Sequence, residues 1–343
     1  MSGRSFASIG KTPTPGSVPK MKIKYGKKPM LHVVDASNWM CRAYFATQKS
    51  PTYAKDGTPT YGLRQFLYMV KDLIDIAAKD PNGAYLAFCF DPSSSDTWRY
   101  RAIQQWAAEH KKKYIRQVFK KSSDYKGNRD RTQTVELGPQ MTLAREILQM
   151  AGYYVGIKKP YECDDLVGTL CDRFKHDYLI KLYSRDKDYV QLVDHKNVEL
   201  IMQAQSNAPE RRFDFKTAQG FFGVPANRVI DMLALCGDGV DNVPGIPGLG
   251  EKTSIELINK WGGALGIRDA LLSGKLKSNA GWAKALTMQV PAMDIELQME
   301  LVTIDRNVPC LPRNIEAFAP SRPDIKALKA TKKRLALPQL LHV

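Results

Sequence analysis

The sequence lacks the marks of several protein classes. It has no run of roughly 18 apolar residues, so we expect no membrane-spanning helix. The basic N-terminus has no apolar core of the kind that a secretion signal needs, and we expect none. The six cysteines form no C-x-x-C pair, and the five histidines show no zinc-binding spacing. This pattern predicts free thiols in a reducing compartment, hence a cytoplasmic protein.

Acidic residues are fewer than basic ones, and the excess is unevenly placed. The net charge of +16 divides into +7 for residues 1–28, +8 for residues 99–131 and +5 for residues 313–343. The rest of the chain carries −4. Basic segments around an acidic body suit a polyanion held over a carboxylate-lined metal site, although such runs can also serve only solubility. Residues 1–28, rich in Ser, Gly, Pro and Lys, predict a disordered tail.

Three short apolar runs each lead into aspartates. Residues 30–34 lead into Asp35, residues 85–90 into Asp91, and residues 178–183 into Asp186 and Asp188. Helical patterns over residues 62–78 and 138–150 alternate with these runs, and a weaker strand is predicted over residues 153–157. With 43% hydrophobic residues the chain can bury a core of one large or two smaller domains. The alternation predicts an α/β fold with a parallel sheet, whose ligands bind beyond the carboxyl ends of the strands.

Three more acids stand together at a predicted helix start. Glu162, Asp164 and Asp165 directly precede the apolar residues of that helix. Acids in a first turn complement the helix dipole, so N-capping explains one of them or two. It does not explain three neighbouring carboxylates that repel one another.

The segment Gly237–Ile258 (GDGVDNVPGIPGLGEKTSIELI) combines two acids with a glycine hairpin. Asp238 and Asp241 precede the hairpin, and helices are predicted over residues 228–236 and from Glu251. This arrangement predicts a helix–hairpin–helix that grips a phosphate backbone. The predicted DNA contacts of the hairpin are Gly245, Gly248, Gly250, Lys252 and Thr253. The alternative is a glycine-rich turn with two solvated acids.

The acids together predict a metal site. The set comprises Asp35, Asp91, Glu162, Asp164, Asp165, Asp186, Asp188, Asp238 and Asp241. So many carboxylates in one pocket need cations, and an all-oxygen site favours Mg²⁺ or Mn²⁺. Two ions about 3.5–4 Å apart can clamp the attacking and leaving oxygens of a phosphodiester. We expect Asp35, Asp91, Glu162 and Asp164 around one ion, the last four acids of the set around the other, and Asp165 between them or behind their ligands.

Residues 98–131 form the basic segment, which leaves the second strand just after Asp91. A basic arm above the acids would hold a phosphate against the metals. We expect Lys126 and Arg129 to act in catalysis by neutralising the scissile phosphate, alongside Asp35 and Asp164 as metal ligands. Arg99, Tyr125, Lys126 and Arg129 are the predicted DNA contacts of this segment. Tyr125, Trp98 and Trp106 can stack on unpaired bases or simply pack in the core.

The ordered set of motifs resembles the 5′-nuclease (flap endonuclease) family. The pattern is closest to the nuclease domain of bacterial DNA polymerase I and to free-standing bacteriophage 5′-3′ exonucleases. The matching segments, which span roughly residues 30–310, are VVDASNWMCRAYFA (33–46), AFCFDPSSSDTWR (87–99), DYKGNR (124–129), YECDDLVGTL (161–170), YSRDKDYVQLV (183–193) and GDGVDNVPGIPGLGEKT (237–253). Each motif alone is weak, whereas all six in the family order are specific.

The resemblance implies a fold and an activity. The fold is a PIN-like, mostly parallel sheet flanked by helices, with a helical arch and a helix–hairpin–helix subdomain. The activity is hydrolysis of DNA near the junction of a 5′ flap and duplex, with two Mg²⁺ or Mn²⁺ ions and K⁺ at the hairpin. Nicked and gapped duplexes and RNA–DNA hybrids are the further partners. A monomer in a bacterial or bacteriophage-infected cell, serving replication, primer removal or repair, is expected.

The expected domain plan has four parts. Residues 1–28 form the tail, residues 29–205 the catalytic domain with its arch at about 98–131, residues 206–300 the DNA-binding subdomain, and residues 301–343 a return strand and basic tail. A strand is expected over residues 301–304.

Three features depart from the family pattern. Ala36 and Arg185 replace glycines, and the arch is longer by about residues 103–122. The alternatives to this nuclease are a PIN-type ribonuclease and a non-catalytic branched-DNA-binding protein. Every expected carboxylate is present, which favours an active enzyme, while the hairpin and arch argue against the ribonuclease.

Overall fold

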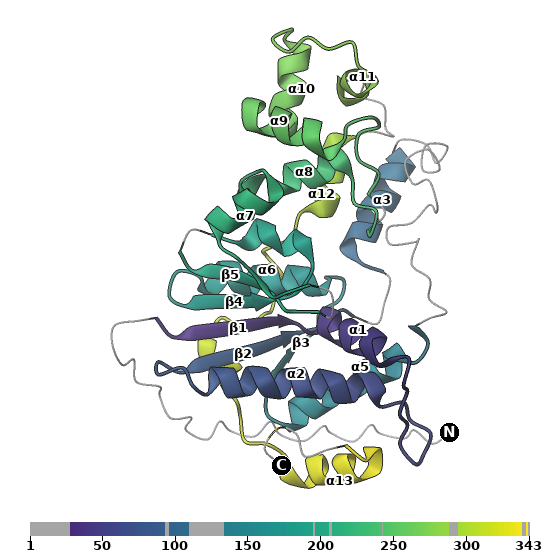
Figure 1. The fold of residues 1–343 in the computed structure, drawn as a ribbon, viewed down its shortest axis with the longest axis vertical. Helices are drawn as coiled ribbons and strands as arrows, with labels where there is room; N and C mark the ends of the chain where they lie inside the picture. The colour runs from purple at the N-terminus through teal and green to yellow at the C-terminus, as the bar shows by residue number, and fades with distance from the viewer. Residues whose placement is uncertain are drawn as a thin grey trace, which may run out of the picture.

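A six-stranded, mostly parallel sheet forms the centre of the computed structural model (Figure 1). The described residues are 28–92, 96–109, 134–194, 196–205, 208–241, 243–287, 294–337 and 341. The strands are β1 (Met30–Asp35), β2 (Ala84–Cys89), β3 (Tyr154–Gly156), β4 (Leu179–Tyr183), β5 (Val198–Met202) and β6 (Arg211–Phe213). Their order is β3-β2-β1-β4-β5-β6, and β6 alone of these runs antiparallel. The predicted α/β fold is therefore confirmed.

Helices cover both faces of the sheet. One face carries α1 (Ala36–Thr47), α2 (Tyr61–Ala77) and α5 (Leu137–Met150), and α13 (Ile325–Leu335) packs on α5. The other face carries α6 (Cys163–Phe174). In β2, Leu86 and Phe88 enter the first layer, while Tyr85, Ala87 and Cys89 enter the second. Burial on both faces explains why these strands read as continuous apolar runs.

Successive strands are added to the sheet in one direction up to β3 and in the opposite direction from β4 on, so β1 and β4 are neighbours. From β1 the chain builds outward through β2 to β3, then returns to place β4 and β5 on the other side of β1. Such a switch point opens a crevice at the carboxyl ends of the two central strands. Asp35 ends β1 there, and residues that follow β4 enter the same crevice.

A helical part stands beyond one edge of the sheet (Figure 1). It comprises α7 (Phe215–Phe222), α8 (Val229–Cys236), α9 (Glu251–Trp261), α10 (Ala264–Leu272), α11 (Gly281–Thr287) and α12 (Ile295–Val302). The hairpin joins α8 to α9; α8 lies within one residue of its predicted bounds, and α9 begins at the predicted residue. Helix α3 (Trp98–Glu109), the start of the basic segment, packs against α12.

Three details of the predicted domain plan are wrong. Residues 301–304 form no strand, because α12 continues to Val302 and its apolar residues pack toward α8. The C-terminal region is not wholly a tail, because α13 buries Leu328 and Leu335. The boundary after residue 205 is too early, because β6 completes the sheet by pairing with β5.

Candidate active site

Asp35 ends β1 at the switch point of the sheet. It caps α1, with its Oδ1 atom accepting from the Asn38 N–H at 2.9 Å. The Ser184 hydroxyl donates to its Oδ2 atom at 2.9 Å. Burial raises the pKa of Asp35 to about 7; nearby Asp91 adds to the shift, while the Asn38 N–H opposes it. Sequence reasoning missed Asn38 and Ser184, because one polar residue after a strand or inside a helix gives no distinctive pattern.

Asp91 and Asp164 lie near Asp35, and the three form what we term the first acid group. The Asp91 Oδ1 atom accepts from the backbone N–H of Cys163 at 2.9 Å, which joins the end of β2 to the start of α6. The charges of Asp91 and Asp164 both raise the pKa of Asp35. Cys163 is buried between these acids, and its thiol donates to Asp35 Oδ1 at 3.4 Å.

Four aspartates form the second acid group: Asp186, Asp188, Asp238 and Asp241. Asp186 and Asp188 lie at the start of the 3-10 helix η3 (Lys187–Leu192), just after β4. Burial raises the pKa of Asp188 well above its usual range, and the charges of the other three aspartates raise it further. Acids from the strand end and from the hairpin segment are therefore close enough for their charges to interact. The ammonium of Lys187 lies 3.2 Å from Asp238 Oδ2 and offsets part of the negative charge.

The second acid group has an oxygen that suits a cation. Asp188 Oδ1 is buried and accepts no hydrogen bond from the described residues. A buried carboxylate oxygen without a donor is costly, and a hard divalent cation would satisfy it. Within the described ranges, however, no three Asp, Glu, His or Cys side chains already converge on one point as a ligand set. The metal-binding roles of these acids stay predictions.

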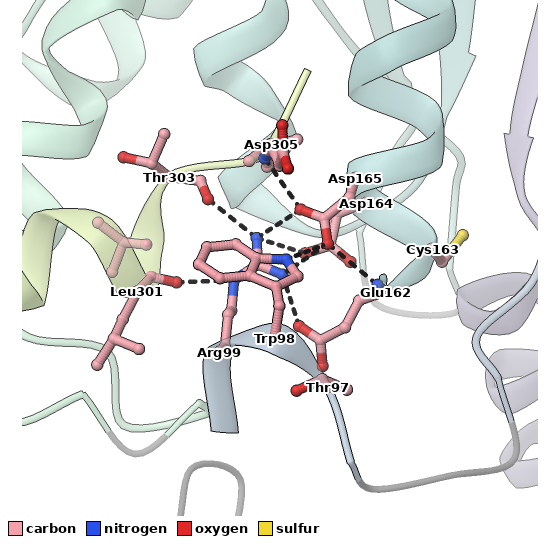
Figure 2. A network of polar contacts seen from close by, with 12 residues as sticks. Thr97, Trp98, Arg99, Glu162, Cys163, Asp164, Asp165, Leu301, Thr303 and Asp305 are labelled. Atoms are coloured by element: carbon pink, nitrogen blue, oxygen red, sulfur yellow. Dashed lines mark hydrogen bonds and ion pairs between the residues drawn. The ribbon is translucent and has the colours of Figure 1, made fainter. Parts of the chain in front are cut away.

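Glu162 and Asp165 contact protein donors, as Figure 2 shows. Asp165 is fully buried and accepts from Arg99 through both oxygens, from Trp98 Nε1 at 2.7 Å and from the Asp305 N–H at 2.9 Å. Glu162 Oε2 accepts from Arg99 Nη1 at 2.8 Å. The oxygens of Asp165 are therefore held by protein donors, and its place relative to a metal ion stays a prediction. Glu162 is held by the same guanidinium.

The expectation that Arg99 contacts DNA is wrong. Its side chain is 2% exposed, enclosed by carboxylates and backbone carbonyls. Its position in the basic segment suggested a surface residue, but its charge neutralises buried acids instead. Trp106 is buried and donates to Asp294, in agreement with the packing alternative, whereas the half-buried Trp98 donates to Asp165 and its stacking on bases stays untested. The other predicted contacts of this segment, Tyr125, Lys126 and Arg129, lie outside the described residues.

The hairpin has a tight base and an open tip. Gly245 has φ +69°, and a Cβ atom there would lie 2.4 Å from the backbone carbon of Cys236. Gly248 and Gly250 would meet nothing within 4 Å, so the backbone at the tip is open to approach. Helix α9 begins directly after Gly250, and Lys252 and Thr253 are exposed in its first turn. A helix N-terminus with glycines before it suits a phosphate, and the DNA contacts predicted for this tip stay predictions.

Arg185, one of the departures from the family pattern, does not enter the acid groups. Its guanidinium donates to the Gln203 carbonyl beyond β5, and its backbone N–H donates to Asn38 Oδ1 at 3.3 Å. Ala36, the other departure, is fully buried at the start of α1. Both substitutions leave the aspartates in place.

Two family models match the chain. The N-terminal resolvase-like domain of 5′-3′ exonucleases matches residues 30–219, and their C-terminal SAM fold matches residues 224–326. A 5′-3′ exonuclease of Aquifex aeolicus is 30% identical over 91% of this chain and 93% of its own length. The thermostable DNA polymerase I of Thermus filiformis is 29% identical over 59% of the chain, but only 23% of that polymerase is covered. The models divide after β6, in agreement with the corrected boundary.

Solved structures share the fold. The zinc-bound T5 5′-exonuclease matches with a TM-score of 0.58 and 18% identity, over 80% of this chain and 90% of that one. The catalytic core of Rad2 with a DNA substrate matches with a TM-score of 0.53 and 16% identity, over 91% and 90%. The flap endonuclease of Methanococcus jannaschii matches with a TM-score of 0.54 and 12% identity, over 89% and 86%.

Proposed function

The chain belongs to the 5′-3′ exonuclease family, and we propose that it hydrolyses phosphodiester bonds near the junction of a 5′ flap and duplex DNA. One observation carries the proposal. Asp238, at the base of the hairpin, lies beside Lys187 and contributes to the charge around Asp188 at the end of β4. A duplex held by the hairpin would therefore have its backbone next to the carboxylates.

The two acid groups are the proposed holders of two divalent ions. Mg²⁺ or Mn²⁺ there would supply positive charge that stabilises the attacking and leaving oxygens of the phosphodiester. Asn38 and Ser184 orient the Asp35 carboxylate toward this task. Lys126 and Arg129 are proposed to neutralise the scissile phosphate. Membership of the 5′-3′ exonuclease family supports the proposed metal ions. The buried Asp188 oxygen that accepts no hydrogen bond from the described residues also supports them.

The finer features of the substrate are also proposals. The substrate set comprises 5′-flap, nicked and gapped duplexes, with RNA in RNA–DNA hybrids cleaved by the same site. The open tip of the hairpin, Gly248 to Gly250, is proposed to hold a duplex phosphate. A K⁺ ion is proposed to bind both the hairpin tip and that phosphate. We propose a monomer acting in the cytoplasm of a bacterial or bacteriophage-infected cell, which agrees with the free cysteines of the described ranges. No helix among the described residues is long and apolar enough to span a membrane.

One assay tests the function. End-labelled single strand, blunt duplex, nicked, gapped and 5′-flap DNA are incubated with the protein, with Mg²⁺ and with EDTA, and the products are sized. We expect Mg²⁺-dependent cleavage of the flap substrate close to the junction, leaving a 5′-phosphate and a 3′-hydroxyl. Cleavage at the same rate and at unrelated positions whether or not a flap is present would contradict the proposal. So would binding without any cleavage in Mg²⁺ and Mn²⁺.

A further inference from the structure

The Arg99 guanidinium uses each of its five N–H donors inside the protein. Three hydrogen bonds go to carboxylates at the start of α6: one to Glu162 and two to Asp165, at 2.8–3.1 Å. The other two go to backbone carbonyls at the end of α12, those of Leu301 and Thr303, each at 3.0 Å. Figure 2 shows the guanidinium between these two sets of acceptors. One side chain thus joins α6 to α12.

Helix α12 belongs to the part of the molecule that carries the hairpin. It packs against α8, the helix that leads into the hairpin. Its other end is also tied to α3, because Trp106 Nε1 donates to the carboxylate of Asp294, the N-cap of α12, at 3.2 Å. Helix α3 therefore runs along α12 and is fixed near both ends, with Arg99 at the end that faces the acids.

We propose that Arg99 is a positioning residue that fixes the first turn of α6, and with it Asp164, relative to the helices that hold the duplex. The proposal rests on the proposed function, because it assigns Asp164 to a metal ion. Arg99 does not contact the substrate. It acts through Glu162 and Asp165, whose carboxylates it both neutralises and orients, while Asp164 Oδ2 lies 3.8 Å from its Nη2 atom.

A guanidinium is needed for this task, and an ammonium would not serve. Two nitrogens of Arg99 pair with both oxygens of Asp165, which sets the plane of that carboxylate. A lysine would keep the positive charge but has three donors and no planar fork, so it cannot satisfy five acceptors from two elements. Groups that hold metal ligands in place typically change metal affinity about 10–100-fold when they are altered.

The test compares Arg99→Lys with Arg101→Lys in the full chain. Arg101 lies two residues further along α3, where it is exposed and pairs with Asp96, so it controls for loss of an arginine on the same helix. Mn²⁺ affinity is measured by titration calorimetry without DNA. Affinity for a 5′-flap duplex is measured in EDTA at several salt concentrations.

We expect Arg99→Lys to weaken Mn²⁺ binding at least about tenfold and to change flap affinity less than about twofold. Arg101→Lys should have the Mn²⁺ affinity and the flap affinity of the wild type. Unchanged Mn²⁺ affinity in folded Arg99→Lys would overturn the proposal. So would a loss of flap affinity with a shallower salt dependence, which marks a phosphate contact. A wild-type chain that binds no Mn²⁺ would overturn the proposed metal site and this role together.

A second variant covers the case in which Arg99→Lys does not fold. Trp98→Phe removes one donor to Asp165 and leaves Arg99 in place. We expect it to weaken Mn²⁺ binding by a smaller factor, about threefold, because Asp165 keeps its pair with Arg99. A folded Trp98→Phe chain with wild-type Mn²⁺ affinity would then count against the positioning role.

Discussion

At the residue scale, the carboxylate of Asp35 is fixed by several contacts. This residue is 6% exposed, it caps α1, and it accepts from Asn38, Ser184 and Cys163. Asp35→Asn keeps the size of the side chain but removes its charge. We expect cleavage of flap DNA in Mg²⁺ to fall by roughly 10²–10³-fold or more. Flap affinity, measured by anisotropy in EDTA, should persist; substantial turnover by this variant would remove Asp35 from the metal site.

The same carboxylate should make the metal-free protein sensitive to pH. Its pKa is about 7 in the folded chain, against an ordinary value of 3.8. The folded state therefore holds a proton that the unfolded state releases between these values. The free energy of unfolding should fall as pH rises through this window, by an amount on the order of 4 kcal/mol at most.

Asp35→Asn removes this source of pH dependence. In EDTA, urea unfolding at pH 5 and pH 8 should show a smaller loss of stability for the variant than for the wild type. The acids of the second group are present in both chains, so the difference between the chains reports Asp35 together with its interactions with Asp91 and Asp164. Equal losses would show that Asp35 ionises freely in the folded protein.

The positions of the acids could be predicted from sequence, but not every contact they make. Strands that end in aspartate place Asp35 and Asp91 at one sheet edge, because parallel strands share that edge. The sequence reasoning misplaced Arg99 because it opens a segment rich in lysine and arginine, of the kind that usually lies on the surface. Its acceptors on α12 are about 200 residues away, as the separation of 202 between Arg99 and Leu301 shows, and no local pattern brings them to it.

At the element scale, the hairpin depends on a close approach at its base. Gly245→Ala would place a Cβ atom against the backbone of Cys236, in a conformation with φ +69°. Gly248→Ala shares the positive φ but meets nothing within 4 Å, so it is the matched control. We expect Gly248→Ala to lose about 1–2 kcal/mol of unfolding free energy, and Gly245→Ala clearly more.

Urea denaturation of the two variants measures this difference. Similar stability losses in the two variants would mean that the base of the hairpin relaxes readily and does not fix the position of Asp238.

Helices with a clear period were easier to predict than short strands. The apolar spacing of α2 and α5 placed both helices to within one residue at each end. Strands β5 and β6 were missed, since β6 has three residues and two of them are exposed. The run at residues 301–304 was misread as a strand because a few apolar residues carry no distinguishable period.

At the scale of the whole molecule, folding gathers acids that lie far apart in sequence. The switch point between β1 and β4 collects Asp35, Asp91 and Asp186 from three strand ends. The hairpin segment adds Asp238 from the helical part, and Arg99 ties that part to the start of α6. The proposed chemistry depends on this convergence, because it needs both groups of acids beside one duplex.

The most direct test is a crystal of the protein soaked in Mn²⁺, with the ions located by anomalous scattering. We predict one ion held by the first acid group and one by the second, with Asp188 Oδ1 among the ligands of the second. Density for ordered protein with no manganese peak at either group, or with the peaks bound elsewhere on the surface, would contradict it.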